Sequence, residues 1–202
     1  MGAGQYFEPT PHVPSRPSSV TLALADMTLA LTTDRGVFAA GAVDAGTRLL
    51  LLDAPAPPVA GDLLDLGCGY GPIACALARR ARRATVWAVD VNERALGLCA
   101  TNATANDIHN VRAVHPDEVP ADVRFAAIWS NPPIRIGKPA LHDLLSTWLA
   151  RLTPDGCAVL VVQRHLGADS LTAWLRGQGH AVDRVASRQG YRLLVVRPTV
   201  AP

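Results

Sequence analysis

Short apolar runs alternate with segments of helical periodicity from Asp62 to the end of the chain. Repeated strand–helix–strand units predict a parallel sheet with helices on both faces, because right-handed crossovers place the helices there. The last two runs are separated only by residues 187–190, too few for a crossover, so we expect an antiparallel hairpin. The expected strands are 63–66, 85–89, 111–114, 125–129, 158–163, 181–186 and 192–196, and the expected helices are 73–82, 93–105, 139–152 and 169–176. The chain should fold as an α/β protein with a seven-stranded, mostly parallel sheet whose last strand is reversed.

The first part of the chain lacks this alternation. Prolines among small polar residues predict an extended surface arm in residues 1–18, and alternating apolar residues at 20–25 and 28–32 predict a short hairpin. We expect Thr47 to cap a leucine-rich helix that ends at Asp53, followed by a proline-rich linker. The expected organisation is an N-terminal arm, hairpin and helix at 1–58, packed on a main domain at 59–202.

The length and composition are those of one globular domain. The chain has 202 residues, of which 49% are apolar and 18% charged, so a single core is expected. Neither a signal peptide nor an apolar run of roughly 18 residues is present, which predicts a cytoplasmic protein. The four cysteines include no Cys-x-x-Cys pair and are expected to be reduced and mostly buried. A net charge of +2 does not decide whether nucleic acid binds, so that argument must be local.

A glycine-rich turn, Asp-Leu-Gly-Cys-Gly-Tyr-Gly at 65–71, follows the first expected strand of the main domain. In open parallel sheets, ligands bind beyond the carboxyl ends of the strands, and glycines let a ligand approach the backbone closely. The G-x-G-x-G spacing and the acidic Asp65 disfavour a dinucleotide phosphate and suit a cationic ligand such as S-adenosylmethionine. Asp90 ends the next strand, where a carboxylate can accept both ribose hydroxyls. A purely structural turn and a nicotinamide-dinucleotide site remain the alternatives.

The fourth expected strand runs into Asn131-Pro132-Pro133. The prolines fix φ, remove two N–H donors and hold the asparagine rigidly. The Asn131 side-chain oxygen and the Pro132 carbonyl, expected to have no competing donor, can then both accept hydrogen bonds from one planar amino group. Such amines are poorly nucleophilic, so acceptors that draw the amine out of plane localise its lone pair toward a methyl donor. The turn predicts transfer to an exocyclic amine, with an ordinary strand-ending turn as the alternative.

Together these residues resemble class I methyltransferases, specifically the methyltransferase small domain family of ribosomal RNA guanine-N2 methyltransferases and their single-domain archaeal-type relatives. The resemblance covers most of the chain and rests on Tyr6-Phe7, Pro9, Gly36-Val37-Phe38, Asp44-x-Gly46-Thr47, the loop from Asp65, the segment from Asn131 to Lys138, Leu141-His142 and Gly190-Tyr191-Arg192. It implies a Rossmann-like fold in which 59–202 is the catalytic, cofactor-binding domain. It also implies methyl transfer from S-adenosylmethionine to the N2 amine of a guanine in RNA, with ribosomal RNA or an assembling ribosomal subunit as partner.

Carried over residue by residue, the resemblance implies a cofactor site and an acceptor site. The catalytic residues are Asn131 and Pro132, which hold the target amine. The glycine loop would line the methionine part of the cofactor, Asp90 the ribose, and Asp117 the adenine amine. The expected cofactor residues are Phe38, Asp65, Gly67, Cys68, Gly69, Asp90, Val91, Asp117 and Asn131. The expected substrate-binding residues are Pro133, Ile134, Arg135, Lys138, Arg188, Tyr191 and Arg192.

The last hairpin should reverse at the carboxyl edge of the sheet and gather basic side chains around one mouth. The basic residues expected there are Arg135, Lys138, Arg164, His165, Arg188 and Arg192. Phosphate neutralisation supplies the sequence-independent part of RNA affinity, and Tyr191 or Phe38 could stack on an unpaired base.

Other acceptors and other classes of function stay open. The same turn serves amino-methyltransferases that act on adenine N6 or on a protein glutamine amide, although Ile134 stands where many of these carry an aromatic residue. A nicotinamide oxidoreductase and a non-catalytic, cofactor-binding RNA module are the alternatives of other classes. The histidines lack metal-ligand spacing, so no metal is expected, and the chain should be a monomer or a homodimer.

Overall fold

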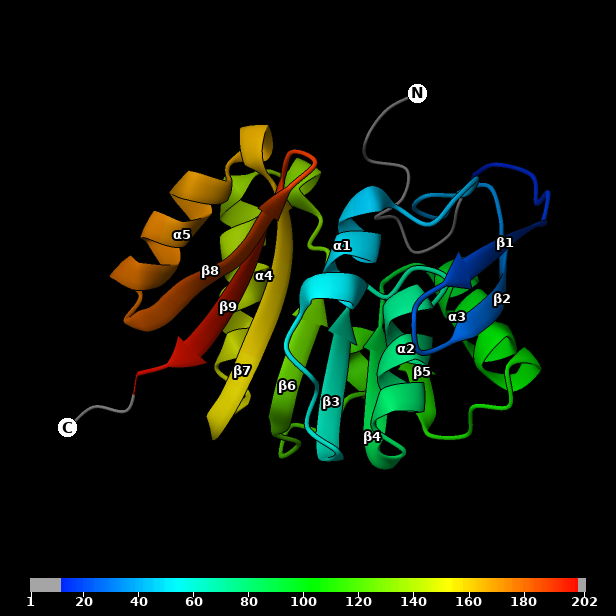
Figure 1. The fold of residues 1–202 in the computed structure, drawn as a ribbon, viewed down its shortest axis with the longest axis horizontal. Helices are drawn as coiled ribbons and strands as arrows, with labels where there is room; N and C mark the ends of the chain where they lie inside the picture. The colour runs from blue at the N-terminus through cyan, green and yellow to red at the C-terminus, as the bar shows by residue number, and fades with distance from the viewer. Residues whose placement is uncertain (1–11, 200–202) are drawn as a thin grey trace.

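The computed structural model describes residues 12–199, and its centre is a seven-stranded sheet (Figure 1). The strands are β3 (Ala60–Leu66), β4 (Arg83–Val89), β5 (Val111–Val114), β6 (Phe125–Ser130), β7 (Leu152–Gln163), β8 (His180–Arg188) and β9 (Tyr191–Pro198). Their order is β5-β4-β3-β6-β7-β9-β8, and β9 alone runs antiparallel to its neighbours, β7 and β8. The predicted mostly parallel sheet with a reversed last strand is confirmed.

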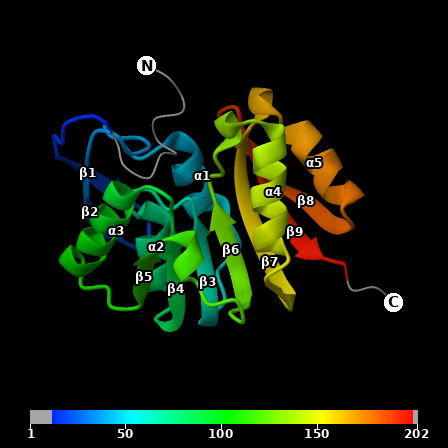
Figure 2. The same ribbon diagram turned by 180° about the vertical axis from the view of Figure 1, so that it is seen from behind.

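Helices cover both faces of the sheet (Figures 1 and 2). The helices α1 (Ala45–Asp53), α2 (Pro72–Arg80) and α3 (Glu93–Ala105) pack on one face, and α4 (Lys138–Leu149) and α5 (Ala168–Gly177) pack on the other. Successive residues of a strand pack into the cores on opposite faces of the sheet: Leu63 packs with the first group of helices and Leu64 with the second. Among the described residues, no helix combines the length and apolar character needed to cross a membrane.

The start of β7 is the largest difference from the predicted strands. This strand begins at Leu152 instead of 158, and α4 ends earlier than expected, at Leu149. The intervening residues include a proline, an aspartate and a glycine, which interrupt the apolar pattern. These residues form a bulge, because Leu152 pairs with Phe125 and the next pair joins Cys157 to Ala127.

The N-terminal hairpin consists of β1 (Ser18–Ala23) and β2 (Thr28–Thr33), as predicted. It packs against α3, where Asn102 accepts a hydrogen bond from the Thr32 N–H (2.7 Å) and donates one to its carbonyl (2.8 Å). The predicted arm lies partly outside the described residues. Its described part is tied to β2, because Ser15 Oγ and the Arg16 N–H both donate to Asp34.

The connections between strands create a crevice at the carboxyl edge of the sheet. From β3 the chain adds β4 and β5 on one side, and it then returns to place β6 on the other side of β3. The loops after β3 and β6 therefore diverge at a topological switch point, where ligands bind in open α/β sheets. Ser130 Oγ donates to the Leu66 carbonyl (2.7 Å) and joins the two strand ends below that crevice.

Candidate active site

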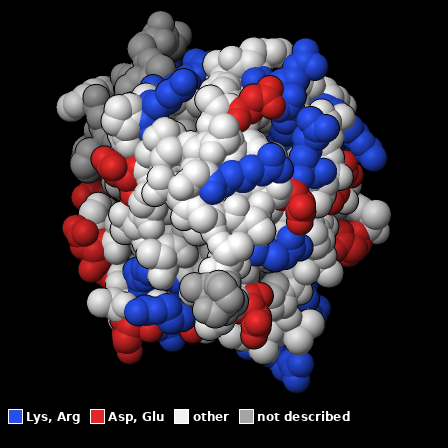
Figure 3. Space-filling model, turned by 90° about the vertical axis from the view of Figure 1, so that its left-hand side faces the viewer, with Lys and Arg blue, Asp and Glu red and all other residues white. Residues whose placement is uncertain are grey.

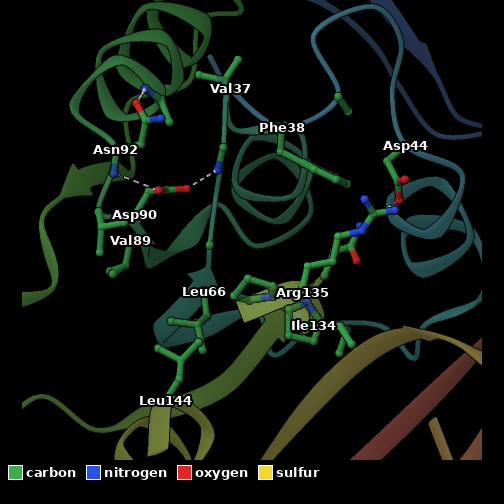
Figure 4. Close-up of a pocket in the computed structure, with 18 of the residues that line it drawn as sticks. Val37, Phe38, Asp44, Leu66, Val89, Asp90, Asn92, Ile134, Arg135 and Leu144 are labelled. Atoms are coloured by element: carbon green, nitrogen blue, oxygen red, sulfur yellow. Dashed lines mark hydrogen bonds between the residues drawn. The ribbon is translucent and has the colours of Figure 1, made fainter. Parts of the chain in front are cut away.

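A cavity of about 370 Å³ opens at this crevice. In Figure 4, Val89 and Asp90 lie on one side of it and Asp44 and Arg135 on the other, with Phe38 above. The predicted residues that line it are Phe38, Gly67, Gly69, Asp90, Val91, Asn131, Pro132, Pro133, Ile134, Arg135 and Tyr191. Its other lining residues include Val37, Leu66, Asn92, Pro116, Leu144, Trp148 and Leu166. This size and largely apolar lining suit a small-molecule site.

The glycine loop presents bare backbone to the cavity. Gly67 and Gly69 have φ of 75° and 54°, and a Cβ built on either would meet no atom within 4 Å. The Asp90 carboxylate holds this loop, since it accepts hydrogen bonds from the Gly69 N–H (2.9 Å) and the Asn92 N–H (3.0 Å; Figure 4). Burial raises the pKa of Asp90, and these backbone hydrogen bonds oppose the increase. An open backbone loop beside a carboxylate at the second strand tip fits the methionine and ribose parts of S-adenosylmethionine.

Asp65 lies beneath the glycine loop and is fully buried, so it does not line the cavity. Its Oδ2 accepts a hydrogen bond from the Ala74 N–H (2.8 Å) in the first turn of α2, and its Oδ1 is buried without a partner. Burial raises the pKa of Asp65 to about 8; the Ala74 hydrogen bond lowers it and the nearby charge of Asp90 raises it further. This carboxyl group therefore holds α2 against the strand, whereas the sequence suggested contact with a cationic ligand.

We expect the Asp65 carboxyl group to make stability depend on pH. The folded protein keeps this proton up to about pH 8, whereas the unfolded chain releases it near pH 4. The folded state thus binds more protons in this window, so the free energy of unfolding falls as pH rises and levels off above pH 8. The slope approaches about 1.4 kcal/mol per pH unit. Urea unfolding between pH 5 and pH 9 should show this excess slope in the wild type and not in Asp65→Asn; parallel curves would contradict it.

Asn131 follows β6 and is half-buried at the cavity wall. Its Nδ2 donates to Asp44 Oδ2 (2.8 Å) and to Thr47 Oγ1 (3.1 Å), both at the start of α1. The expectation that the Pro132 carbonyl has no competing donor is wrong, because the Ile134 N–H donates to it (2.8 Å). This is an inverse γ-turn centred on a proline with φ of −73° and ψ of 68°. A carbonyl oxygen has a second lone pair, so it can still accept from a ligand.

Several predicted site residues lie outside the cavity wall. Cys68 borders a smaller hollow next to the cavity, and the Asp117 side chain is 91% exposed, while its neighbour Pro116 lines the cavity. Arg188 Nε lies 3.3 Å from Asp53 Oδ2 and forms an ion pair with it. The Arg192 side chain is only 13% exposed and pairs with Asp169. These two arginines are already engaged within the protein.

Basic side chains nevertheless gather near the carboxyl edge of the sheet. The hairpin turn between β8 and β9 lies there, because the Arg164 N–H donates to the Gly190 carbonyl (2.7 Å). Lys138 is exposed at the start of α4, and Arg135 is exposed in the 3₁₀ turn before it. In the space-filling view of the α5 and β8 side, Lys and Arg side chains cluster toward the top of the molecule (Figure 3).

Asp44 has a role in this site that was not predicted from the sequence. The predicted Thr47 cap is wrong: Asp44 is the N-cap of α1, and its side chain accepts from the Thr47 N–H (3.0 Å). An aspartate five residues before the first leucine of a buried apolar segment is a recognisable capping signal. Nothing in the local sequence, however, indicates that the same carboxylate bonds Asn131.

Buried asparagine Asn92 was also missed. It donates to the Gly36 carbonyl (2.8 Å) and accepts from the Ala95 N–H (3.1 Å), so it ties the loop that carries Phe38 to the start of α3.

Among residues 12–199, no cluster of three or more His, Cys, Asp or Glu side chains could hold a metal ion.

Comparison with known proteins gives the site its context. Residues 28–195 match the methyltransferase small domain family. The chain is 36% identical to the uncharacterized protein YbxB of Bacillus subtilis, over 94% of this chain and 96% of that protein. It is 32% identical to ribosomal RNA small subunit methyltransferase C of Shewanella halifaxensis, over 78% of this chain and 46% of that protein.

A solved structure extends the comparison to the bound cofactor. The fold matches the 16S rRNA N2 methyltransferase RsmC of T. thermophilus, determined with AdoMet and guanosine, at a TM-score of 0.78 and 26% identity. The match covers 94% of this chain and 52% of that one, so the chain spans about half of this enzyme and of its Shewanella relative. These similarities decide against the nicotinamide alternative. The chain belongs to the methyltransferase small domain family and is an S-adenosylmethionine-dependent methyltransferase.

Proposed function

We propose that this methyltransferase acts on the exocyclic N2 amine of a guanine in RNA, with ribosomal RNA as the substrate class. The observation that carries the proposal is the position of Asn131, whose side chain borders the same cavity as the glycine loop. An amide oxygen there can accept a hydrogen bond from a planar amine while the methyl donor lies on the glycines. The T. thermophilus enzyme, which holds AdoMet and guanosine, supports guanine as the acceptor.

Bound S-adenosylmethionine supplies a methyl group on a positively charged sulfur, ready for attack by a nitrogen lone pair. Gly67, Gly69 and Asp90 would hold it at the carboxyl ends of β3 and β4. Asn131 Oδ1 and the second lone pair of the Pro132 carbonyl would accept the two amine N–H groups and turn the nitrogen lone pair toward the methyl carbon. As the nitrogen–carbon bond forms, the carbon–sulfur bond would break and leave S-adenosylhomocysteine. The methylated nitrogen is then acidic and would release one proton to water, so no strong base is needed.

Apolar side chains complete the acceptor end of the cavity. Ile134 and Leu166 line this end. Ile134 stands directly after Pro132-Pro133, where many amino-methyltransferases have an aromatic side chain. Phe38 lines the opposite wall with 44% of its surface exposed, and Tyr191 lies at the rim. Either ring can stack on an unpaired base, so we assign base clamping to these two residues.

RNA affinity should depend on Arg135 far more than on Arg192. Arg135 is exposed at the cavity mouth, whereas Arg192 is engaged by Asp169. We expect Arg135→Ala to weaken binding of an RNA fragment several-fold at low salt. The slope of the logarithm of the binding constant against the logarithm of salt concentration should become shallower by about one, the equivalent of one phosphate contact. Arg192→Ala should change neither quantity. Fluorescence anisotropy across a salt series checks this, and a larger effect of Arg192→Ala would contradict it.

The most direct test is nucleoside mapping by mass spectrometry of ribosomal and transfer RNA from cells with and without the gene. Loss of one N2-methylguanosine from ribosomal RNA, restored by the wild-type gene, is the expected result. Loss of N6-methyladenosine would favour adenine as the acceptor, and loss of a methylated glutamine, measured in protein digests from the same cells, would favour a protein acceptor. Transfer of radioactive methyl from S-adenosylmethionine to unmodified ribosomal RNA in vitro then tests whether this methyltransferase acts on RNA directly.

A further inference from the structure

We propose that Asp44 is a positioning residue for methyl transfer: it fixes the orientation of the Asn131 side-chain amide, so that Oδ1 faces the target amine. The proposal rests on the proposed function, because it requires that the acceptor be an amine. Asp44 precedes β3 and lies 87 positions before Asn131 in the chain. In the folded protein its Oδ2 accepts from Asn131 Nδ2 at 2.8 Å.

The chemistry of the two groups makes this contact directional. A carboxylate only accepts hydrogen bonds, whereas a primary amide has one accepting end and one donating end. Asn131 must therefore turn Nδ2 toward Asp44. Thr47 Oγ1, at 3.1 Å, accepts from the same Nδ2, but a hydroxyl can pair with either end of an amide, so the carboxylate sets the direction. Because Nδ2 is occupied by these two acceptors, Oδ1 is the end left for a ligand. An amide without these partners could present either end to the ligand.

The Asp44 carboxylate is itself held in place. Its Oδ2 also accepts from the Thr47 N–H at 3.0 Å, so the first turn of α1 orients it. Tyr191 packs on the same turn, since a Cβ on Gly46 would lie 2.7 Å from its ring. Burial raises the pKa of Tyr191, and the charge of Asp44 and a hydrogen bond to it raise it further. The cap of α1, the end of β6 and the start of β9 thus meet at this carboxylate.

Capping of α1 is the competing explanation for Asp44, and substitution can separate the two roles. Serine is also a good N-cap, but its hydroxyl is too short to replace a carboxylate that reaches Asn131. Asp44→Ser should therefore keep α1 and release the amide. Asp44→Asn keeps the side-chain volume and the cap, but its own amide can offer either end to Asn131. Asp183→Ser is the matched control, because Asp183 lies on β8 and pairs with Arg197, outside the cavity wall.

The first readout is methylation of ribosomal RNA from cells that lack the gene. We expect Asp44→Ser to lower kcat at least tenfold while the Kd for S-adenosylmethionine changes less than twofold. Asp44→Asn should give an intermediate kcat, and Asp183→Ser should match the wild type. Retention of the wild-type kcat by Asp44→Ser would overturn the proposal, as would a loss of kcat explained by an equal loss of cofactor affinity.

The second readout does not require a substrate. The Asn131 side-chain amide signals can be assigned in a ¹H–¹⁵N spectrum by their loss in Asn131→Ala. One of these protons should resonate downfield in the wild type, because it donates to a carboxylate, and should move upfield in both Asp44 variants but not in Asp183→Ser. Unchanged amide signals would overturn the positioning role. A wild type that methylates no RNA would instead refute the proposed function, and this spectrum would still decide whether Asp44 orients the Asn131 amide.

Discussion

Replacing Asn131 with alanine is expected to lower kcat by a factor of about 10² to 10³ while leaving the affinity for S-adenosylmethionine almost unchanged. The side chain is proposed to act on the amine, and, although the resemblance also places Asn131 beside the cofactor, the glycine loop that borders the cofactor region is held separately by Asp90. A group that acts in the transition state affects kcat and kcat/KM without affecting cofactor binding. Single-turnover methylation and calorimetric titration with S-adenosylmethionine measure the two quantities.

The Asn131→Ala variant also loses the hydrogen bonds to Asp44 and Thr47, so some loss of stability must be expected. Each bond contributes about 1 kcal/mol, which is small enough for the protein to stay folded. Asn106→Ala is a suitable control, because Asn106 likewise joins two segments, through bonds to the backbone of Ala30, but lies outside the cavity wall. It should be destabilised similarly and retain its kcat. Asn131→Ala with an undiminished kcat would contradict the mechanism.

The fold was predictable because alternation of apolar strands and helices is a local pattern that topology rules convert into a sheet. The expected four-residue link, 187–190, was enough to predict the reversal of β9, and in the structure only residues 189–190 separate β8 from β9. The early start of β7 was not predictable, because Leu152 is separated from the regular pairing, which resumes at Cys157, by residues 153–156, which lack partners in β6. Hydrophobic periodicity detects burial of side chains, and residues 153–156 form a bulge without an apolar pattern.

The cavity wall was predictable for a related reason. Gly67, Asp90 and Asn131 all follow parallel strands, so the carboxyl edge brings them together whatever the details of packing. Contacts between distant segments were not predictable from residue types. The bond from Asn131 to Asp44 and the pair of Arg192 with Asp169 depend on how α1 and α5 pack on the sheet. The first adds a residue to the site, and the second removes an arginine from the expected RNA surface.

Alanine substitutions at Gly69 and Gly71 are expected to have opposite consequences, although both glycines belong to one motif. Gly69 has φ of 54°, and a Cβ there would project into open space at the cavity. Gly69→Ala should cost about 1 to 2 kcal/mol of stability for its left-handed backbone, and its methyl group would occupy space proposed for the cofactor. We expect a stable fold with at least a hundredfold weaker binding of S-adenosylmethionine.

Gly71 is required by packing instead of by the ligand. Its φ is 90°, and a Cβ there would lie 2.6 Å from Cys99 Sγ and 3.2 Å from the Cys99 Cα. Backbone of α3 would have to move, so Gly71→Ala should lose about 3 kcal/mol or more in urea unfolding. Adding Cys99→Ala removes the nearest atom and should restore part of that stability, whereas it should not restore cofactor binding to Gly69→Ala.

If Gly69→Ala bound S-adenosylmethionine like the wild type, the cofactor would not lie against this loop. If Gly71→Ala were as stable as the wild type, the close packing of α3 on the loop would be refuted, so unfolding and cofactor titration test the two glycines independently.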